Sequence, residues 1–393
     1  MSEKSVSLRD YYARKKRLAR RLRRKKILLQ LIREQTKIVK FRLSTIKVFK
    51  PVITPWEGLA ILIGTQVGAG ILGLPYAASR VGMVPALFIL LGVMLLLMST
   101  ALIILKLSAE MRGAQMSTMA QKLLGNAGGW IMYLSILIMG FGAMLAYIAG
   151  MGSVFSSLFG VNETIGAIIF WLLASAVIYL GLEASGKTEL IMSLLMLILF
   201  IGITASLFPY AKLENAMYAE VGGMLSMTGV AIFALGCHTI IPDIYRGIGD
   251  YRKTRNVVIL AFLIPTIIYA IFMISFLLVF GRDTPQIATQ GLEILYGRLG
   301  KIVGNIIPLL AITTSYIGIG LAQQSNSKEF LKLKKPIAWS LTTIPPIVVY
   351  LAGIKNFADV LAFAGDTGDL MAFIILPVVM LAIKRYRERR ASD

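Results

Sequence analysis

Inside a long apolar run the chain reads Gly64-Thr65-Gln66-Val67-Gly68-Ala69-Gly70-Ile71-Leu72-Gly73-Leu74-Pro75. Glycine lowers the stability of a helix and proline removes a backbone donor, so a helix through this stretch is predicted to break. A second such stretch reads Phe233-Ala234-Leu235-Gly236-Cys237-His238-Thr239-Ile240-Ile241-Pro242. Lipid cannot replace the hydrogen bonds that a break releases, so such breaks persist only where they line a cavity or face other protein. We therefore expect both breaks at a functional site.

Apolar runs of about 20 residues, the length that crosses a bilayer, recur along the chain. The sequence is 57% hydrophobic and 16% charged, with a mean hydropathy of +0.75. A large soluble helical protein would need polar helix faces, which most of these runs lack. The sequence therefore predicts an all-α polytopic membrane protein with about ten transmembrane helices. The expected spans are 55–78, 83–107, 128–153, 164–182, 190–208, 222–244, 257–280, 302–321, 337–352 and 359–383.

The sequence offers little for catalysis or for a structural metal. One cysteine, Cys237, excludes an internal disulfide, and one histidine without a Cys/His cluster argues against a zinc site. We find no nucleophile–base set and no nucleotide-binding loop, so we expect neither an enzyme nor an organic cofactor. The first fifty residues are basic and lack an early apolar core, so we expect no cleavable signal peptide.

Basic residues predict the orientation in the membrane. Residues 1–50 hold 18 Lys and Arg against three acidic residues, a net charge of +15 out of +21 for the chain. Because basic segments stay in the cytoplasm, we expect this arm there, together with the basic tail after Ile383. The prediction is a multi-pass protein of the cell membrane with both termini cytoplasmic.

The N-terminal arm has the pattern of a basic amphipathic helix. From Asp10 to Lys50 it lacks Gly and Pro, and apolar residues recur at helical spacing: Leu18, Leu22, Leu29, Ile32, Val39, Leu43 and Ile46. Such a helix suits anionic lipid headgroups; the alternative is a solvated topology signal with no specific partner. A basic run without interleaved aromatics or a known module is a weak nucleic-acid signal, so we expect no nucleic acid. We divide the chain into a basic arm (1–53), a transporter domain (54–384) and a basic tail (385–393).

The ten expected spans divide into five and five. An odd number per half inverts the second half relative to the first, and the first span of each half carries a break. This inverted repeat is the plan of many secondary transporters, whose substrate binds at the broken helices. The alternative is that the glycines only allow close helix packing, which is common in membranes.

Four segments carry a resemblance to known families. Gly68 to Ala77 resembles the first-helix signature of the amino acid/auxin permeases and of the tryptophan/tyrosine (hydroxy and aromatic amino acid) permeases, in the amino acid–polyamine–cation superfamily. Their third helix is similar to Ala146-Tyr147-Ile148-Ala149-Gly150. Their sixth helix is similar to Phe233–Pro242 followed by Asp243-Ile244-Tyr245-Arg246. Their eighth helix is similar to Ala311-Ile312-Thr313-Thr314-Ser315-Tyr316-Ile317-Gly318. The resemblance covers about Pro55 to Arg390. It implies the leucine-transporter fold, a 5+5 inverted repeat with helices 1 and 6 broken, and amino acid transport.

The chain departs from these relatives in two places. It ends after the tenth expected span, where relatives usually have eleven. It also reads Gly365-Asp366-Thr367-Gly368-Asp369 where relatives tend to show a glycine pair without acids.

A zwitterionic amino acid brings two charges into a low-dielectric place, where each needs a partner. The N–H groups around Gly68, Ala69 and Gly70 are our candidates for the carboxylate, because a half-helix N-terminus binds anions. Unwound carbonyls are expected to receive the ammonium. By resemblance, the pocket is lined by Thr65, Gln66, Phe233, Ala234 and Gly236, with Tyr147 closing it from the side. Plain packing is the alternative for Tyr147.

Four further ionisable groups lie in or near the expected spans. Intramembrane ionisable groups are functional candidates by default, so we take His238 as a contact of substrate or proton, or else as a neutral hydrogen bond between helices. Asp243 is a gate or proton candidate that can simply pair with Arg246. Asp366 and Asp369, three residues apart, are candidates for a gate or for proton binding, with a solvated vestibule as the alternative.

The resemblance also implies a sodium site. Sodium-coupled relatives of this fold use oxygens of the first break and the eighth helix, and the matching residues here are Gly64, Val67, Ala311, Thr314 and Ser315. The alternative is that the two hydroxyls bond along their own helix. The sequence thus predicts a secondary active transporter of a neutral, aromatic or hydroxy amino acid, with alternating access and Na⁺ as coupling ion. Proton coupling (H⁺), or a sensor on the same fold, is the alternative.

Overall fold

The computed structural model describes residues 49–180 and 186–390, and the regular structure of these residues is entirely helical. The first ten elements are α2 (Pro55–Gln66), α3 (Gly70–Ser79), α4 (Met83–Glu110), α5 (Met116–Phe159), α6 (Glu163–Leu180), α7 (Gly186–Leu207), η1 (Phe208–Tyr210), η2 (Leu213–Asn215), α8 (Met224–Leu235) and η3 (His238–Ile240). The others are α9 (Ile241–Ile248), α10 (Tyr251–Phe280), η4 (Gly281–Asp283), η5 (Ala288–Gly291), α11 (Leu292–Leu331), α12 (Lys335–Leu351), α13 (Phe357–Ala364), η6 (Gly365–Ile375) and α14 (Leu376–Arg390). The all-α class predicted from sequence is therefore confirmed.

Each expected span coincides with one helical element or with two or three consecutive ones. Within the described residues, seven helices are long and apolar enough to cross a membrane, or eight if the bent pair α2–α3 counts as one span. The segment Leu194–Tyr210, which covers the end of α7 and η1, is a shorter apolar helix, and α12 has 17 residues. The count of ten spans therefore stays a prediction.

The first break is a bend of 48° between α2 and α3. Helix α2 begins at a capping box, in which Thr54 and Glu57 bond each other's backbone, and it ends at Gln66. Val67, Gly68 and Ala69 separate it from α3. The second break follows α8, where Gly236 is extended and α9 starts only after the short turn η3. The predicted interruptions are thus where helices end.

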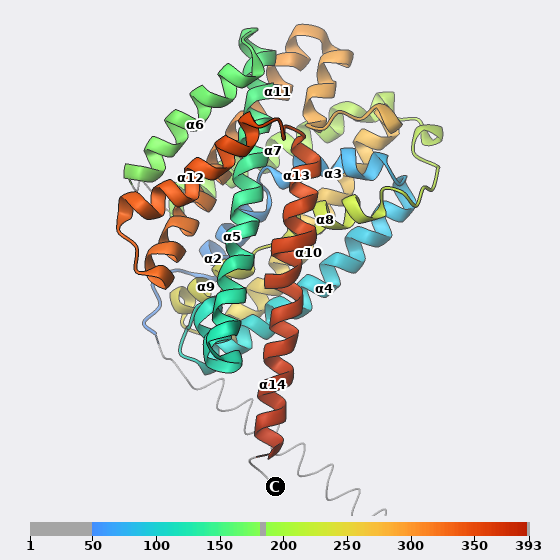
Figure 1. Cartoon of the computed structure of the whole chain (residues 1–393). Helices are drawn as coiled ribbons and strands as arrows, with labels where there is room; N and C mark the ends of the chain where they lie inside the picture. The colour runs from blue at the N-terminus through green and yellow to red at the C-terminus, as the bar shows by residue number, and fades with distance from the viewer. Residues whose placement is uncertain (1–48, 181–185, 391–393) are drawn as a thin grey trace, which may run out of the picture.

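Helix α5 is the central column of the molecule. It packs against α6, α11, α12, α13 and η6, while α2, α3 and α8 pack with α4 and α10 on its other side. Figure 1 shows α13, η6 and α14 as one long red column beside α5 that ends at the C-terminus. Two long helices begin outside their expected spans, because α5 and α11 each continue an earlier helix across a glycine with positive φ, Gly125 (79°) and Gly297 (53°).

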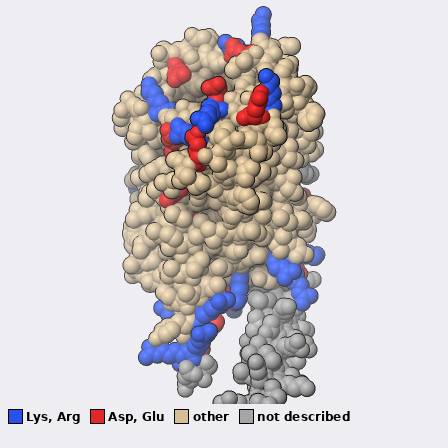
Figure 2. All heavy atoms as spheres, turned by 90° about the vertical axis from the view of Figure 1, so that its right-hand side faces the viewer, with Lys and Arg blue, Asp and Glu red and all other residues tan. Residues whose placement is uncertain are grey.

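Charged side chains gather at the two ends of the molecule. Figure 2 shows a broad band without Lys, Arg, Asp or Glu between them, with Lys and Arg prominent at the lower end. There Lys384 of α14 pairs with Glu110 of α4. At the other end Arg80 pairs with Asp359 at 3.2 Å. This distribution is that expected of a protein embedded in a bilayer.

Of the predicted N-terminal arm only residues 49–53 are described; the rest lies outside the described residues, as do residues 391–393 of the tail. The N–H groups of Val52 and Ile53 both donate to the carbonyl of Gly247, at 2.8 and 3.2 Å. The ring of Phe49 meets Tyr245 edge-on, with 6.0 Å between ring centroids. The chain before α2 therefore lies on the end of α9.

Candidate functional site at the two helix breaks

The two breaks lie directly against each other. A Cβ atom added to Gly70 would lie 2.9 Å from the Cα of Ala234 and 3.1 Å from its Cβ. Only glycine allows α3 and α8 to approach this closely. The predicted binding residues of both halves thus meet, although more than 160 residues of chain separate them.

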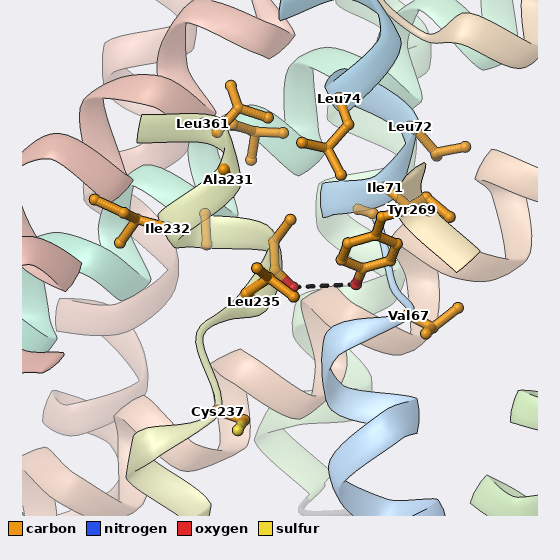
Figure 3. Close-up of a cluster of buried hydrophobic side chains, with 14 of the residues drawn as sticks. Val67, Ile71, Leu72, Leu74, Ala231, Ile232, Leu235, Cys237, Tyr269 and Leu361 are labelled. Atoms are coloured by element: carbon orange, nitrogen blue, oxygen red, sulfur yellow. Dashed lines mark hydrogen bonds between the residues drawn. The ribbon is translucent and has the colours of Figure 1, made fainter. Parts of the chain in front are cut away.

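Tyr269 of α10 joins the breaks through its hydroxyl. That hydroxyl faces the carbonyl oxygens of Gln66 and Ala234, at 2.5 and 3.1 Å, and shares its single hydrogen between them. Both carbonyls lie in the last turns of their helices, where the regular helical bonds run out, and the Gln66 carbonyl also accepts from the N–H of Gly68 at 2.7 Å. Figure 3 shows Tyr269 between the two broken helices, with a hydrogen bond from its hydroxyl to the end of α8.

Gln66 makes a second connection between the breaks. Its side-chain amide donates to the carbonyl of Leu235 at 3.0 Å and to the Sγ of Cys237 at 3.1 Å. The other side-chain atom, Oε1, is buried without a hydrogen-bond partner. Gln66 thus lies in the site, as predicted, but its donor is occupied by the second break.

The N-terminus of α3 has the open backbone that an anion-binding site requires. It has no side-chain cap, and its first backbone N–H groups point out of the helix end. The N–H of Ala69 lies 3.4 Å from the Oγ of Ser315, and a Cβ on Gly68 would lie 2.3 Å from that oxygen. Helix α11 therefore reaches the first break through Ser315.

The predicted sodium ligands are only partly brought together. Ser315 lies beside Gly68 and Ala69, as just described, but the hydroxyl of Thr314 donates to Leu310 and Ala311 of its own helix, at 3.0 and 3.1 Å. Val67 is buried at the end of α2, and Gly64 is partly exposed one turn earlier.

Tyr147 of α5 faces the side chain of Ser315. Its ring also meets that of Phe233 edge-on, at 6.4 Å between centroids. Tyr147 is thus placed beside both breaks, where it was predicted to close the pocket. Thr65, by contrast, is exposed and donates its hydroxyl to Ile61 of its own helix at 2.8 Å.

His238 is fully buried and turned toward neighbouring helices. Its Nε2 lies 2.9 Å from the Oγ1 of Thr100 on α4, and its ring stacks on Phe373 of η6 with 4.5 Å between centroids. Nδ1 is buried without a partner. These contacts are those of a hydrogen bond between helices, the second of the two interpretations given for this residue.

The three acidic candidates lie in different surroundings. Asp243 pairs with Arg246 and accepts from Gln115 at 3.0 Å, at the exposed end of α9. Asp366 faces α8, where a Cβ on Gly229 would lie 2.6 Å from its carboxyl group. Asp369 is 1% exposed, and its Oδ1 has no partner.

Sequence reasoning missed Tyr269 and Phe373. Phe373 lies against Gly236 of the second break, where a Cβ would be 2.7 Å from its ring. One signal for Tyr269 was available: it is a polar side chain within an apolar run, and a buried hydroxyl in a membrane needs a partner. Phe373 has no comparable signal, because phenylalanine is ordinary in an apolar span.

Comparison with known families gives a match over almost the whole described chain. A model of the tryptophan/tyrosine permease family matches residues 54–392. The chain is 25% identical to "Tyrosine-specific transport system 1" of Haemophilus influenzae, with 84% of this chain and 87% of that protein covered. It is 24% identical to "Glutamine transporter 2" of Aliivibrio fischeri, with 84% and 88% covered. It is 21% identical to "Tryptophan-specific transport protein" of Haemophilus influenzae, with 85% and 88% covered.

Two solved structures are similar in fold. MhsT in complex with L-phenylalanine has a TM-score of 0.62 at 15% identity, covering 85% of this chain and 89% of that one. Mhp1 in an inward-facing conformation has a TM-score of 0.58 at 14% identity, covering 82% and 77%. The leucine-transporter fold implied by the family resemblance is thereby confirmed.

Proposed function

The chain belongs to the tryptophan/tyrosine permease family, a family of amino acid transporters and not of enzymes, and we propose that it is a secondary active transporter of a neutral amino acid, aromatic or hydroxy, that works by alternating access. The names of its relatives, which include tyrosine, tryptophan and glutamine transporters, support the substrate class. MhsT, of the same fold, binds phenylalanine.

The observation that carries this proposal is the contact between the two breaks. Gly70 and Ala234 bring the open N-terminus of α3 and the end of α8 to one place in the membrane. The N-terminus of α3 supplies N–H groups and the positive end of a helix dipole for the substrate carboxylate. The rings of Phe233 and Tyr147, which meet edge-on, supply an apolar wall for the substrate side chain.

For the coupling ion we propose sodium, held by oxygens of the first break and of α11. Ser315, which already lies beside Ala69, supports this assignment, because an ion there would join α11 to the first break. The remaining ligands are Gly64, Val67, Ala311 and Thr314. Thr314 would exchange its bond to its own helix for the ion.

We further propose that the arm and tail lie in the cytoplasm of a cell whose inner leaflet is anionic. The Lys and Arg side chains at the lower end of the molecule support this orientation.

The test is uptake of radiolabelled tyrosine, tryptophan, phenylalanine and glutamine by vesicles that contain the purified full-length protein. Each is measured with a sodium gradient, with a proton gradient, and with neither. We expect saturable uptake of at least one of them, accelerated by sodium. Binding without uptake under every gradient would contradict transport and favour a sensor. Uptake driven only by the proton gradient would contradict the sodium assignment and leave transport standing.

A further inference from the structure

Asp369 lies in the π-helical stretch η6, within the candidate membrane span Phe357–Arg390. Two glycines allow this stretch to pack closely between α5 and α8. A Cβ on Gly365 would lie 1.8 Å from the carbonyl oxygen of Gly229, and one on Gly368 would lie 2.5 Å from the backbone nitrogen of Met139. Asp369, next in the chain, is therefore 99% buried where both helices approach. Wide π-helical turns within a helix are frequent at functional sites.

Among residues 49–180 and 186–390, this carboxyl group forms no ion pair. Its Oδ1 is buried without a hydrogen bond. The ion pairs of these residues engage Arg80, Arg246, Arg282, Lys301 and Lys384, and none of them reaches Asp369. A buried, unsatisfied carboxyl group is costly, so its persistence calls for a partner that arrives from outside.

Asp369 lies near Tyr147 and one turn before Phe373, and both of these residues lie beside the breaks. It is close enough to Tyr147 for its charge to act on the tyrosine hydroxyl. Phe373, one turn further along η6, lies against Gly236 of the second break, so this face of η6 is turned toward that break. Tyr147 therefore stands between Asp369 and the first break, which it approaches through Ser315.

The break carbonyls are partly engaged by the protein itself. Gln66 and Ala234 accept from Tyr269, and Leu235 accepts from Gln66. A substrate with its carboxylate at the N-terminus of α3 would lay its side chain along the wall made by Phe233 and Tyr147. The far end of that side chain would then be directed past Tyr147 toward Asp369.

We propose that Asp369 accepts a hydrogen bond from a donor at the far end of the substrate side chain. It thereby makes the transporter select amino acids that end in O–H or N–H over amino acids of the same shape that lack the donor. The proposal rests on the proposed function and adds a specificity-determining residue to it. A buried polar group in a binding site strongly disfavours a substrate analogue that leaves it without a hydrogen bond. This discrimination is much larger than that of an apolar pocket between substrates that differ only in shape.

The test compares matched substrate pairs on the purified full-length protein in detergent. The pairs are tyrosine against phenylalanine, and tryptophan against benzothienylalanine, in which sulfur replaces the indole N–H. Dissociation constants are measured for the wild type, for Asp369→Leu and for Asp369→Asn. Asp366→Asn is the control, because Asp366 lies in the same stretch but faces Gly229 of α8.

We expect the wild type to bind the donor-bearing member of at least one pair roughly 10- to 100-fold more tightly, the range of a hydrogen bond to a charged group. Asp369→Leu should remove this preference and leave the affinity for the donor-free member unchanged or improved. Asp369→Asn, which keeps the shape, should reduce the preference, and Asp366→Asn should retain it. Asp369→Leu should also melt no earlier than the wild type, because it replaces an unpaired buried polar group by an apolar one.

Two results would overturn the inference and leave the proposed function intact. One is a wild type that binds amino acids without preferring the donor-bearing member of either pair. The other is an Asp369 variant that loses affinity for both members of a pair equally, or that keeps the wild-type ratio of the two affinities. An equal loss of affinity, together with uptake that no longer responds to a proton gradient, would make Asp369 a proton site. If the wild type binds none of the four compounds, the inference falls, and if it also takes up no glutamine under any gradient, the proposed function is itself wrong.

Discussion

At the scale of single residues, the Tyr269 hydroxyl supplies one hydrogen to two backbone oxygens that belong to different halves of the chain. Because Gln66 and Ala234 end their helices, this bond sets how far apart the two broken helices stand. Gln66 adds a second link through Leu235 and Cys237. The motifs could place Gln66 near a break, but its partners lie about 170 residues further on, and no local pattern predicts such a pairing.

We predict that Tyr269→Phe loosens the pairing of the breaks. Removing the hydroxyl leaves the Ala234 carbonyl without its donor and the Gln66 carbonyl with only the N–H of Gly68, which costs about 1–3 kcal/mol. The melting temperature should fall and the amino acid affinity should weaken. Tyr316→Phe is the matched control, because its buried hydroxyl bonds Ser175 at 2.9 Å, away from the breaks. Equal affinity in the two variants would show that Tyr269 supports only the fold.

At the scale of elements, the glycine and proline pattern predicted where helices break better than where they begin. Both interruptions are helix ends, because glycine and proline act locally. The start of α5 at Met116 was missed, because that part of the helix precedes the apolar run and continues across Gly125. The packing of the chain before α2 on α9 was also invisible, since it depends on backbone bonds to Gly247, about 195 residues away.

Residues 49–53 are expected to keep this end of the molecule closed. We predict that Phe49→Ala, which removes the ring that meets Tyr245, lets this end open more often. Cys237, the single cysteine, is 1% exposed at the second break and reports such opening. A small maleimide should label it several-fold faster in the variant. Val52→Ala is the control, since that side chain is 83% exposed and its backbone bond to Gly247 remains. Labelling of Phe49→Ala at the rate of Val52→Ala would contradict this role.

The arm before these residues is expected to be separate from transport. We predict that deletion of residues 2–45 leaves amino acid affinity unchanged, because the deletion keeps Phe49 and its contact with α9. Binding to vesicles that contain anionic lipid should weaken, since most of the basic charge is removed. A deleted protein that inserts normally and loses substrate binding would make the arm part of the mechanism.

At the scale of the whole molecule, the apolar runs and the paired breaks predicted the fold, because hydrophobic length and backbone hydrogen bonding constrain a membrane protein strongly. The arrangement of side chains around the breaks was less predictable. Thr65 and His238 were grouped with the pocket by position, but their side chains bond their own helix and a neighbouring helix. Facing directions depend on how ten segments pack together, and a motif does not contain that information.

The coupling ion belongs to this scale, because it would join parts of the molecule that move relative to each other. If sodium binds between the first break and α11, it stabilises the conformation in which Ser315 lies beside Ala69. A ligand shifts conformations only through such differential contacts. Coupling is reciprocal, so sodium should raise the amino acid affinity, and the amino acid should raise the sodium affinity by the same factor. Both factors can be measured by titration calorimetry on one purified sample.

We predict that Thr314→Val combined with Ser315→Ala abolishes this coupling. The pair removes both hydroxyls at little change in shape, and the Thr314 hydroxyl otherwise bonds only its own helix, so the fold should survive. Thr313→Val is the control, because its hydroxyl bonds Leu309 in the same way and is not among the proposed ligands. Amino acid binding by the control should still rise with sodium, while that of the double variant should not. If wild-type binding is indifferent to sodium and uptake follows a proton gradient, these oxygens form no working ion site. His238, Asp366 and Asp369 are then the groups to test, and His238 and Asp369 are the two of them that are buried.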